Sequence, residues 1–169
     1  MSQAPSTGLR AAIFDVDGVL VDSPHEEAWR EALRSLMEGE WASLRSHTRW
    51  TPEAFTPAVY QREISGKPRT NGARDALAWF GVPDDDEETR VSEYAARKQA
   101  VLERLIAAGD FRPYLDGLRF LVDLRRAGFA LAAASSSKNA RSLLDAVDLR
   151  AYAPAAGIDL SALPPGRSL

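Results

Sequence analysis

The sequence predicts an α/β fold with a parallel sheet, interrupted by a large helical insert. Two short apolar runs without alternation, residues 11–14 and 129–134, are typical of strands buried on both faces. Apolar residues at helical spacing fill most of the chain between and after these runs. Helices that separate buried strands along the chain favour parallel pairing, because a parallel connection needs a crossover.

The composition is that of an ordinary globular domain and excludes several functional classes. The 169 residues include 21 Lys or Arg and 24 Asp or Glu, which gives a net charge of −3. This balance provides neither a basic field for nucleic acid nor a polybasic anchor for a membrane. No apolar stretch approaches the roughly 20 residues of a membrane helix. The first ten residues do not resemble a signal peptide.

The sequence contains no cysteine. Disulfides, thiolate zinc sites and cysteine nucleophiles are therefore excluded. Together with the absence of a signal peptide, this composition leads us to expect a cytoplasmic protein.

The first element after the strand at residues 11–14 is expected to be a helix that begins at Ser23. Ser23 suits the N-cap, Pro24 suits the first helical position, and Glu26 completes a capping box. Buried positions recur at helical spacing over residues 28–37 and form one stripe.

More helices are predicted before the second strand. Thr51-Pro52 and Thr56-Pro57 both have the composition of helix starts. Apolar positions at residues 73–80 predict a short helix, and those at residues 91–106 share one face of a long helix.

The remaining elements complete the α/β pattern. A helix is predicted over residues 115–127, the second strand over 129–134, and another helix over 140–147. From Tyr152 onward the sequence is rich in Ala, Pro, Gly and Ser and shows little periodicity, so no element is predicted there.

This order of elements predicts two domains. Residues 24–112 are expected to form the helical insert, and residues 1–23 with 113–169 the core. The insert leaves the core directly after the first strand. Because ligands of open α/β sheets bind outside the carboxyl ends of the strands, we expect the insert to cover the site as a cap.

The strongest functional signal is the pair Asp15 and Asp17, just past the first strand. Carboxylates at i and i+2 can point to the same side of a strand end. They suit Mg²⁺, acid/base chemistry and nucleophilic attack on phosphorus, and Gly18 lets the chain turn sharply beside a ligand. An acidic surface turn is the alternative; a lone Asp-x-Asp would favour it, but the full run from Ile13 to Ser23 does not.

A second cluster, Ser135, Ser136 and Lys138, follows the second strand. Hydroxyls, an ammonium group and a helix N-terminus together suit an anion. A simple N-cap at Ser137 is the alternative. Phosphate binding is favoured because the cluster follows a buried strand in a chain that also holds the acidic pair.

Three residues of the insert are candidates for substrate contacts. Arg69, in a basic turn, could hold a second phosphate bidentately, and Lys98 interrupts an apolar stripe and could add a point charge. Extension of the Lys98 ammonium to solvent is the alternative. His25 is either an incidental surface residue or a hydrogen-bonding partner over the site.

Taken together, these residues resemble the haloacid dehalogenase-like superfamily of phosphohydrolases and phosphomutases, and most of all its beta-phosphoglucomutase-like members with a helical cap. The likeness is carried by the run Asp15–Ser23, by the run Ser135–Asn139, and by His25 with Trp29 in the cap. It covers roughly residues 9–150 and implies a Rossmann-like core.

The resemblance implies Mg²⁺-dependent phosphoryl transfer on a small phosphorylated metabolite such as a sugar phosphate. Asp15 would be the nucleophile that forms an aspartyl-phosphate, and Asp17 the general acid/base. The Asp15 side chain and the Asp17 main-chain carbonyl would hold Mg²⁺, and Ser135 would bind the transferring phosphoryl group. The cap would present three residues to the substrate: His25, Arg69 and Lys98.

The superfamily also has a third-motif lysine and a fourth-motif acidic pair after the second motif. After Lys138 this sequence has no lysine and no adjacent acidic residues. We therefore expect an incomplete core, in a chain that is truncated or read in another frame near Tyr152. In the superfamily the fourth-motif strand lies beside the first, so residues 11–14 would become an edge that invites association with another chain.

Two other functions stay open. A non-catalytic remnant would bind phosphorylated ligands weakly or not at all. A helical interaction module would use the insert as its functional part. Phosphatase and mutase share the motif residues, so the sequence leaves that choice open as well.

Overall fold

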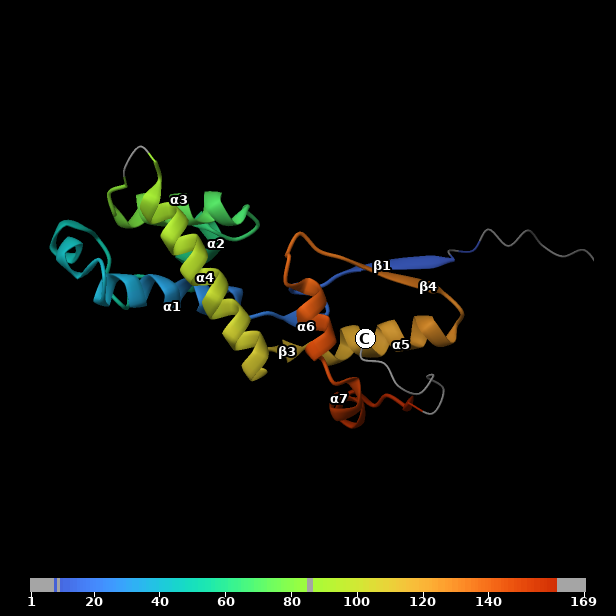
Figure 1. Ribbon diagram of the computed structural model, residues 1–169. Coiled ribbons are helices and arrows are strands. Elements are labelled where there is room, and N and C mark those ends of the chain that lie inside the picture. Colours follow the sequence, from blue (N-terminus) through green and yellow to red (C-terminus); the bar gives the residue numbers. More distant parts are fainter. Residues whose placement is uncertain (1–7, 9, 85–86, 161–169) are drawn as a thin grey trace, which may run out of the picture. The chain divides into compact units, whose positions relative to one another are not determined.

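A computed structural model describes residues 8, 10–84 and 87–160 of the chain (Figure 1). The chain divides into two units, one formed by Met1–Ser23 with Gly109–Leu169 and the other by Pro24–Ala108. The first division falls where the sequence analysis places it. The second falls at Gly109 rather than at residue 113. None of the helices in the described part of the chain has the length and apolar character that a bilayer crossing requires.

The first unit is built on a two-stranded parallel sheet of β1 (Ala11–Asp15) and β4 (Ala130–Ala134). The register runs from Ala11 opposite Ala130 to Asp15 opposite Ala134. The helix α5 (Leu115–Arg126) lies between the strands in sequence and packs against β4. The predicted α/β class with a parallel sheet is therefore confirmed.

The expectation that both strands are buried on both faces is wrong. Phe14 is 8% exposed, and its ring meets the ring of Phe120 on α5 edge-on at 5.9 Å. On the opposite face of β1, Ile13 is 73% exposed. In β4 only Leu131 is partly covered. An unbroken apolar run is compatible with two covered faces, but here α5 covers the Phe14 face while the Ile13 face meets solvent.

The other elements of the first unit are short. Two two-residue strands, β2 (Val21–Asp22) and β3 (Arg112–Pro113), pair antiparallel. The helices α6 (Ala140–Ala146) and α7 (Leu149–Ala156) follow β4, and α7 packs on α5.

The helix α7 was not predicted from the sequence. The Asp148 carboxylate accepts a hydrogen bond from the backbone N–H of Arg150 at its start, and Gly157 at φ 64° ends it. Both signals are visible in the sequence. Pro154 lies inside the helix. Its presence argues against a helix at this position, because proline normally interrupts helical hydrogen bonding.

The N-cap predicted at Ser23 is wrong, and the alternative of an N-cap at Ser137 is wrong as well. The helix α1 (His25–Glu38) has Pro24 at its N-cap position with no side-chain cap, and Ser23 instead donates its hydroxyl to Asp17. The helix α6 likewise has no side-chain cap, and the Ser137 hydroxyl accepts the backbone N–H of Asn139. In both cases the serine hydroxyl makes a different hydrogen bond.

The second unit is helical. After α1 come the 3₁₀ helix η1 (Ala42–His47), α2 (Pro57–Glu63), α3 (Arg69–Phe80) and α4 (Thr89–Ala108). Both α1 and α3 pack on α4. The predicted helix start at Thr56-Pro57 is confirmed, because the Thr56 hydroxyl accepts the N–H of Val59. The predicted start at Thr51-Pro52 is wrong, since a turn follows there.

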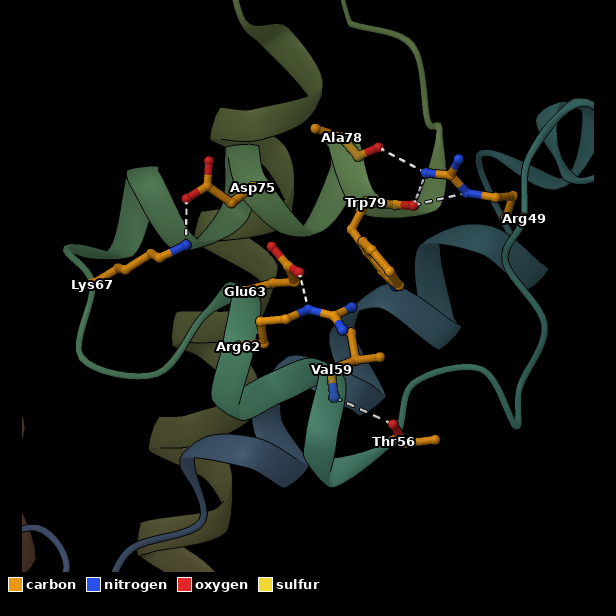
Figure 2. A network of polar contacts seen from close by, with 9 residues as sticks. All are labelled: Arg49, Thr56, Val59, Arg62, Glu63, Lys67, Asp75, Ala78 and Trp79. Carbon is orange, nitrogen blue, oxygen red and sulfur yellow. Dashed lines mark hydrogen bonds and ion pairs between the residues drawn. The ribbon is translucent and has the colours of Figure 1, made fainter.

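Polar contacts join the η1–α2 segment to the end of α3 (Figure 2). The Arg49 guanidinium donates to the backbone carbonyls of Trp79, at 3.0 Å from Nε, and of Ala78, at 3.3 Å. The Arg62 guanidinium lies 4.0 Å from the centroid of the Trp79 ring. Arg49 therefore adds hydrogen bonds at the last turn of α3, where helix carbonyls lack the usual partners; the Ala78 carbonyl also accepts the Gly81 N–H at 3.1 Å.

Gly117 sets a test of the first unit's packing. A Cβ atom at Gly117 would lie 2.6 Å from the carbonyl oxygen of Val19, which is backbone and cannot rotate away. We expect Gly117→Ala to lower the stability by about 1–3 kcal/mol through overpacking, measured by thermal denaturation followed by circular dichroism. The exposed Arg119→Ala on the same helix is the control, with a change within about 0.5 kcal/mol. Equal melting of Gly117→Ala and the unmodified chain would contradict this close approach.

Candidate active site

The acidic pair lies at the carboxyl end of β1. Asp15 is the last residue of the strand, and its carboxylate accepts the backbone N–H of Val16 at 2.8 Å. Gly18, at φ 80°, turns the chain back and donates its N–H to the carbonyl of Val21 at 2.8 Å. The side chain of Val16 is buried beneath the turn. The loop is therefore held by its own backbone while both aspartates stay near the surface.

Asp17 is held by two serines from different parts of the chain. The Ser23 hydroxyl donates to Asp17 Oδ1 at 2.6 Å, and the Ser135 hydroxyl donates to Asp17 Oδ2 at 3.0 Å. Ser135 is 118 residues away in sequence, and the parallel register of β1 and β4 brings it there. Because both carboxylate oxygens accept hydrogen bonds, the orientation of the Asp17 side chain is defined.

The Ser135 turn borders a cavity of about 510 Å³ in the first unit. Its lining includes Ser135, Ser137 and Lys138, with Arg141 and Asp145 from α6. The backbone N–H of Ser137 donates to the Ser135 hydroxyl at 2.9 Å, which closes the turn. Hydroxyls and an ammonium group in the same lining suit an anion. Ser136 belongs to the same turn but does not line this cavity.

The acidic end of the sheet offers hard oxygen ligands but no protein cage for a metal. Among the described residues there is no group of three or more His, Asp or Glu side chains that could hold an ion. The Asp15 carboxylate and the Asp17 carbonyl supply two oxygens. Mg²⁺ is commonly bound by one or two carboxylates and completes its shell with water and substrate phosphate. The donor set fits that mode of Mg²⁺ binding.

In the second unit, His25 and Lys98 lie together. Lys98 is only 5% exposed, so the interpretation that its ammonium extends to solvent is wrong. The Lys98 Nζ atom lies 3.0 Å from His25 Nδ1 and 5.3 Å from the centroid of the Trp29 ring. A buried ammonium needs such partners, because its desolvation is costly.

Arg69 also belongs to the second unit. It is the first residue of α3 and is half-buried. The predicted site residues thus fall in two sets, one in each unit: Asp15, Asp17, Ser135, Ser136 and Lys138 in the first, and His25, Arg69 and Lys98 in the second.

Sequence reasoning missed two supporting residues. The sequence predicts a helix cap at Ser23, whereas its hydroxyl donates to Asp17. The helical pattern places Tyr94 in an apolar stripe, yet its hydroxyl also donates to the backbone carbonyl of Trp29 at 3.0 Å, and its ring packs edge-on against the Trp29 ring at 4.9 Å. The available signal was spacing: Tyr94 lies four residues before Lys98 on the same helix face.

Comparison with known proteins places these observations in a family. The profile of the haloacid dehalogenase-like hydrolases matches residues 9–166. Beta-phosphoglucomutases of Mycobacterium bovis and Mycobacterium tuberculosis are each 32% identical over 149 residues, which cover 80% of this chain and 54% of theirs. The chain therefore spans about half the length of these curated relatives.

A solved structure agrees. The archaeal beta-phosphoglucomutase from the hyperthermophilic Pyrococcus sp. strain ST 04 matches with a TM-score of 0.61 and 26% identity. The match covers 93% of this chain and 59% of the archaeal chain. Both the α/β class and the beta-phosphoglucomutase-like character of the sequence rest on these comparisons.

Tyr94 gives a test of the packing around Lys98. Burial raises the pKa of Tyr94 well above its usual range, so the unfolded chain loses this proton first as the pH rises. The stabilising contribution is full below about pH 10, the unfolded pKa, and falls above it. We expect Tyr94→Phe to lower the free energy of unfolding at neutral pH by about 1 kcal/mol, the value of one hydrogen bond. Between pH 10 and 11 the stability of this variant is expected to fall less steeply than that of the unmodified chain.

Thermal melts from pH 7 to 11 measure both effects. Tyr114→Phe, at a partly exposed tyrosine, is the matched control and is expected to follow the unmodified chain. A Tyr94→Phe variant with the unmodified alkaline profile would contradict the assignment.

Proposed function

Because the chain belongs to the haloacid dehalogenase-like hydrolases, we propose that it performs Mg²⁺-dependent phosphoryl transfer on a small phosphorylated metabolite such as a sugar phosphate. The observation that carries this proposal is the convergence of Asp15, Asp17 and Ser135 at one end of the parallel sheet. The beta-phosphoglucomutase names of the relatives support a sugar phosphate as the substrate class. The cysteine-free sequence is in keeping with a cytoplasmic enzyme.

Asp15 is the proposed nucleophile. One oxygen of its carboxylate accepts the Val16 N–H, which orients the group. A carboxylate oxygen forms the bond to phosphorus while the bond from phosphorus to the leaving oxygen breaks, giving an aspartyl-phosphate. The acceptor, water or a second hydroxyl of the substrate, then attacks phosphorus and releases the Asp15 carboxylate.

Asp17 is the proposed general acid and base. In the first half-reaction its proton passes to the leaving oxygen, and in the second it takes the proton of the acceptor. The Ser23 and Ser135 hydroxyls hold its carboxyl group in place for both transfers. When bound by the Asp15 carboxylate and the Asp17 carbonyl, Mg²⁺ would neutralise charge on the phosphoryl oxygens.

The remaining candidates are proposed to bind the substrate. The phosphoryl group would be held from the turn after β4 by Ser135, Ser136 and Lys138. In support, Ser135 and Lys138 line the same cavity. His25, Arg69 and Lys98 would contact the substrate from the cap. The Lys98 ammonium, already held by His25 and Trp29, would add positive charge without being reordered on binding.

The nucleophile is tested by Asp15→Asn. We expect a fall in kcat on the order of 100-fold or more, because an amide is not a nucleophile toward phosphorus. The assay follows both the release of inorganic phosphate and the isomerisation of a β-glucose phosphate in the presence of Mg²⁺, so that phosphatase and mutase activities are distinguished.

Asp123→Asn, at an exposed aspartate of α5, is the matched control and is expected to keep the unmodified rate. Equal rates for Asp15→Asn and the unmodified chain would refute catalysis through Asp15. No turnover together with measurable binding of a sugar phosphate would favour the alternative, a non-catalytic binding protein.

The phosphate contact is tested by Lys138→Met. Removal of one charged hydrogen-bond donor is expected to weaken the binding of inorganic phosphate by about tenfold, measured by isothermal titration calorimetry. Arg150→Met, which removes one exposed positive charge from α7, controls for the change in net charge. A Lys138→Met affinity equal to that of Arg150→Met would exclude a direct contact.

A further inference from the structure

Four side chains form a cluster between α1 and α4, within the second unit. His25 and Trp29 lie one turn apart on α1. Tyr94 and Lys98 lie one turn apart on α4. Trp29, Tyr94 and Lys98 are all buried. The cluster is therefore part of the interior that α1 and α4 share, and its contacts fix one helix against the other.

Tyr94 contacts Trp29 at two points. The two rings meet edge-on, with their centroids 4.9 Å apart and their planes at 70°. The Tyr94 hydroxyl donates to the Trp29 backbone carbonyl at 3.0 Å. Trp29 lies inside α1, where its carbonyl also faces the N–H of Leu33 in the helical ladder. The Tyr94 hydrogen bond is therefore not a helix cap. It joins the two helices, and with the ring contact it sets the position and orientation of Trp29.

Lys98 depends on the orientation of the same indole. Its Nζ atom lies 5.3 Å from the centroid of the Trp29 ring and 3.0 Å from His25 Nδ1. The attraction between a cation and an indole depends on the cation meeting the face of the ring. An ammonium group donates and cannot accept, so His25 Nδ1 is the acceptor and the neutral imidazole carries its proton on Nε2. The position of Lys98 thus defines one tautomer of His25.

We propose that Tyr94 is a positioning residue that, through Trp29, holds the Lys98 ammonium against His25 in the place where it binds the phosphate of the substrate. The binding half of this proposal rests on the proposed function, in which His25 and Lys98 contact the substrate. A cation that its neighbours already hold binds an anion without the cost of ordering a flexible side chain. The alternative is that Tyr94 serves only the packing of α1 on α4, which would affect stability without moving Lys98.

The tautomer of His25 reports the position of Lys98 without substrate or turnover. The chain has two histidines, so nitrogen NMR of the imidazole rings distinguishes His25 from the exposed His47. At about pH 8, above the usual pKa of histidine, His25 of the unmodified chain is expected to show a single Nε2–H form. Tyr94→Phe keeps the ring and removes the hydroxyl. It is expected to shift His25 toward the mixture of two tautomers that Lys98→Met shows, with His47 unchanged.

Ile106→Val is the matched control. Ile106 is buried on α4, two turns beyond Lys98. The loss of one methylene there lowers stability by an amount similar to the loss of the Tyr94 hydroxyl, but the His25 tautomer is expected to stay as it is. An unchanged His25 spectrum in Tyr94→Phe, or the same change in both variants, would overturn the proposal, because Tyr94 would then serve packing alone.

A double-mutant cycle tests the effect on substrate binding. With a β-glucose phosphate, Tyr94→Phe is expected to raise KM by about threefold or more with kcat nearly unchanged, because binding in the ground state and in the transition state weakens alike. In the Lys98→Met background the same substitution is expected to have no further effect on KM, since the group that it positions is gone. An equal rise in KM with and without Lys98 would show that Tyr94 acts independently of Lys98 and would overturn the proposal.

Failure of the proposed function is a different result. An unmodified chain that neither turns over nor binds a β-glucose phosphate would overturn the proposed phosphoryl transfer and, with it, the role of Tyr94 in substrate binding. The His25 spectrum would still decide whether Tyr94 holds Lys98, because that measurement uses no substrate.

Discussion

The parallel pairing of β1 with β4 is the constraint on which the first unit depends. Its register aligns the carboxyl ends of the two strands, so that Ser135 reaches Asp17 across 118 residues of sequence. A shift of the register by one residue would turn every side chain of the shifted strand to the other face and would separate these groups. The acidic loop, the serine turn and the adjacent cavity therefore follow from one ladder of backbone hydrogen bonds.

The same small sheet explains why one face of β1 is covered and the other is exposed. Two strands suffice to bring functional groups together at one end of the sheet. Within the sheet, α5 covers one face only. Phe14 gains the cover of α5, whereas Ile13 remains in solvent. The proposed chemistry thus uses the carboxyl end of a strand that a helix covers on one face only.

In the second unit the governing feature is a buried charge. Lys98 lies within a helix packed against α1, where His25 and Trp29 surround its ammonium. Tyr94 in turn holds Trp29 through a ring contact and a hydrogen bond. Burying an ammonium group lowers stability unless partners compensate, and His25 and Trp29 provide that compensation for Lys98.

The sequence by itself determined the α/β class, the two strands of the parallel sheet with most of the helices around them, and the acidic and serine motifs, because these depend on periodicity and on neighbours within a few residues. Tertiary structure alone decided which strand face is covered, that Ser23 serves Asp17 rather than a helix, and that Lys98 is buried. It also formed α7 despite Pro154. Burial and hydrogen-bond partners depend on segments distant in sequence, and local patterns carry no information about which distant group arrives.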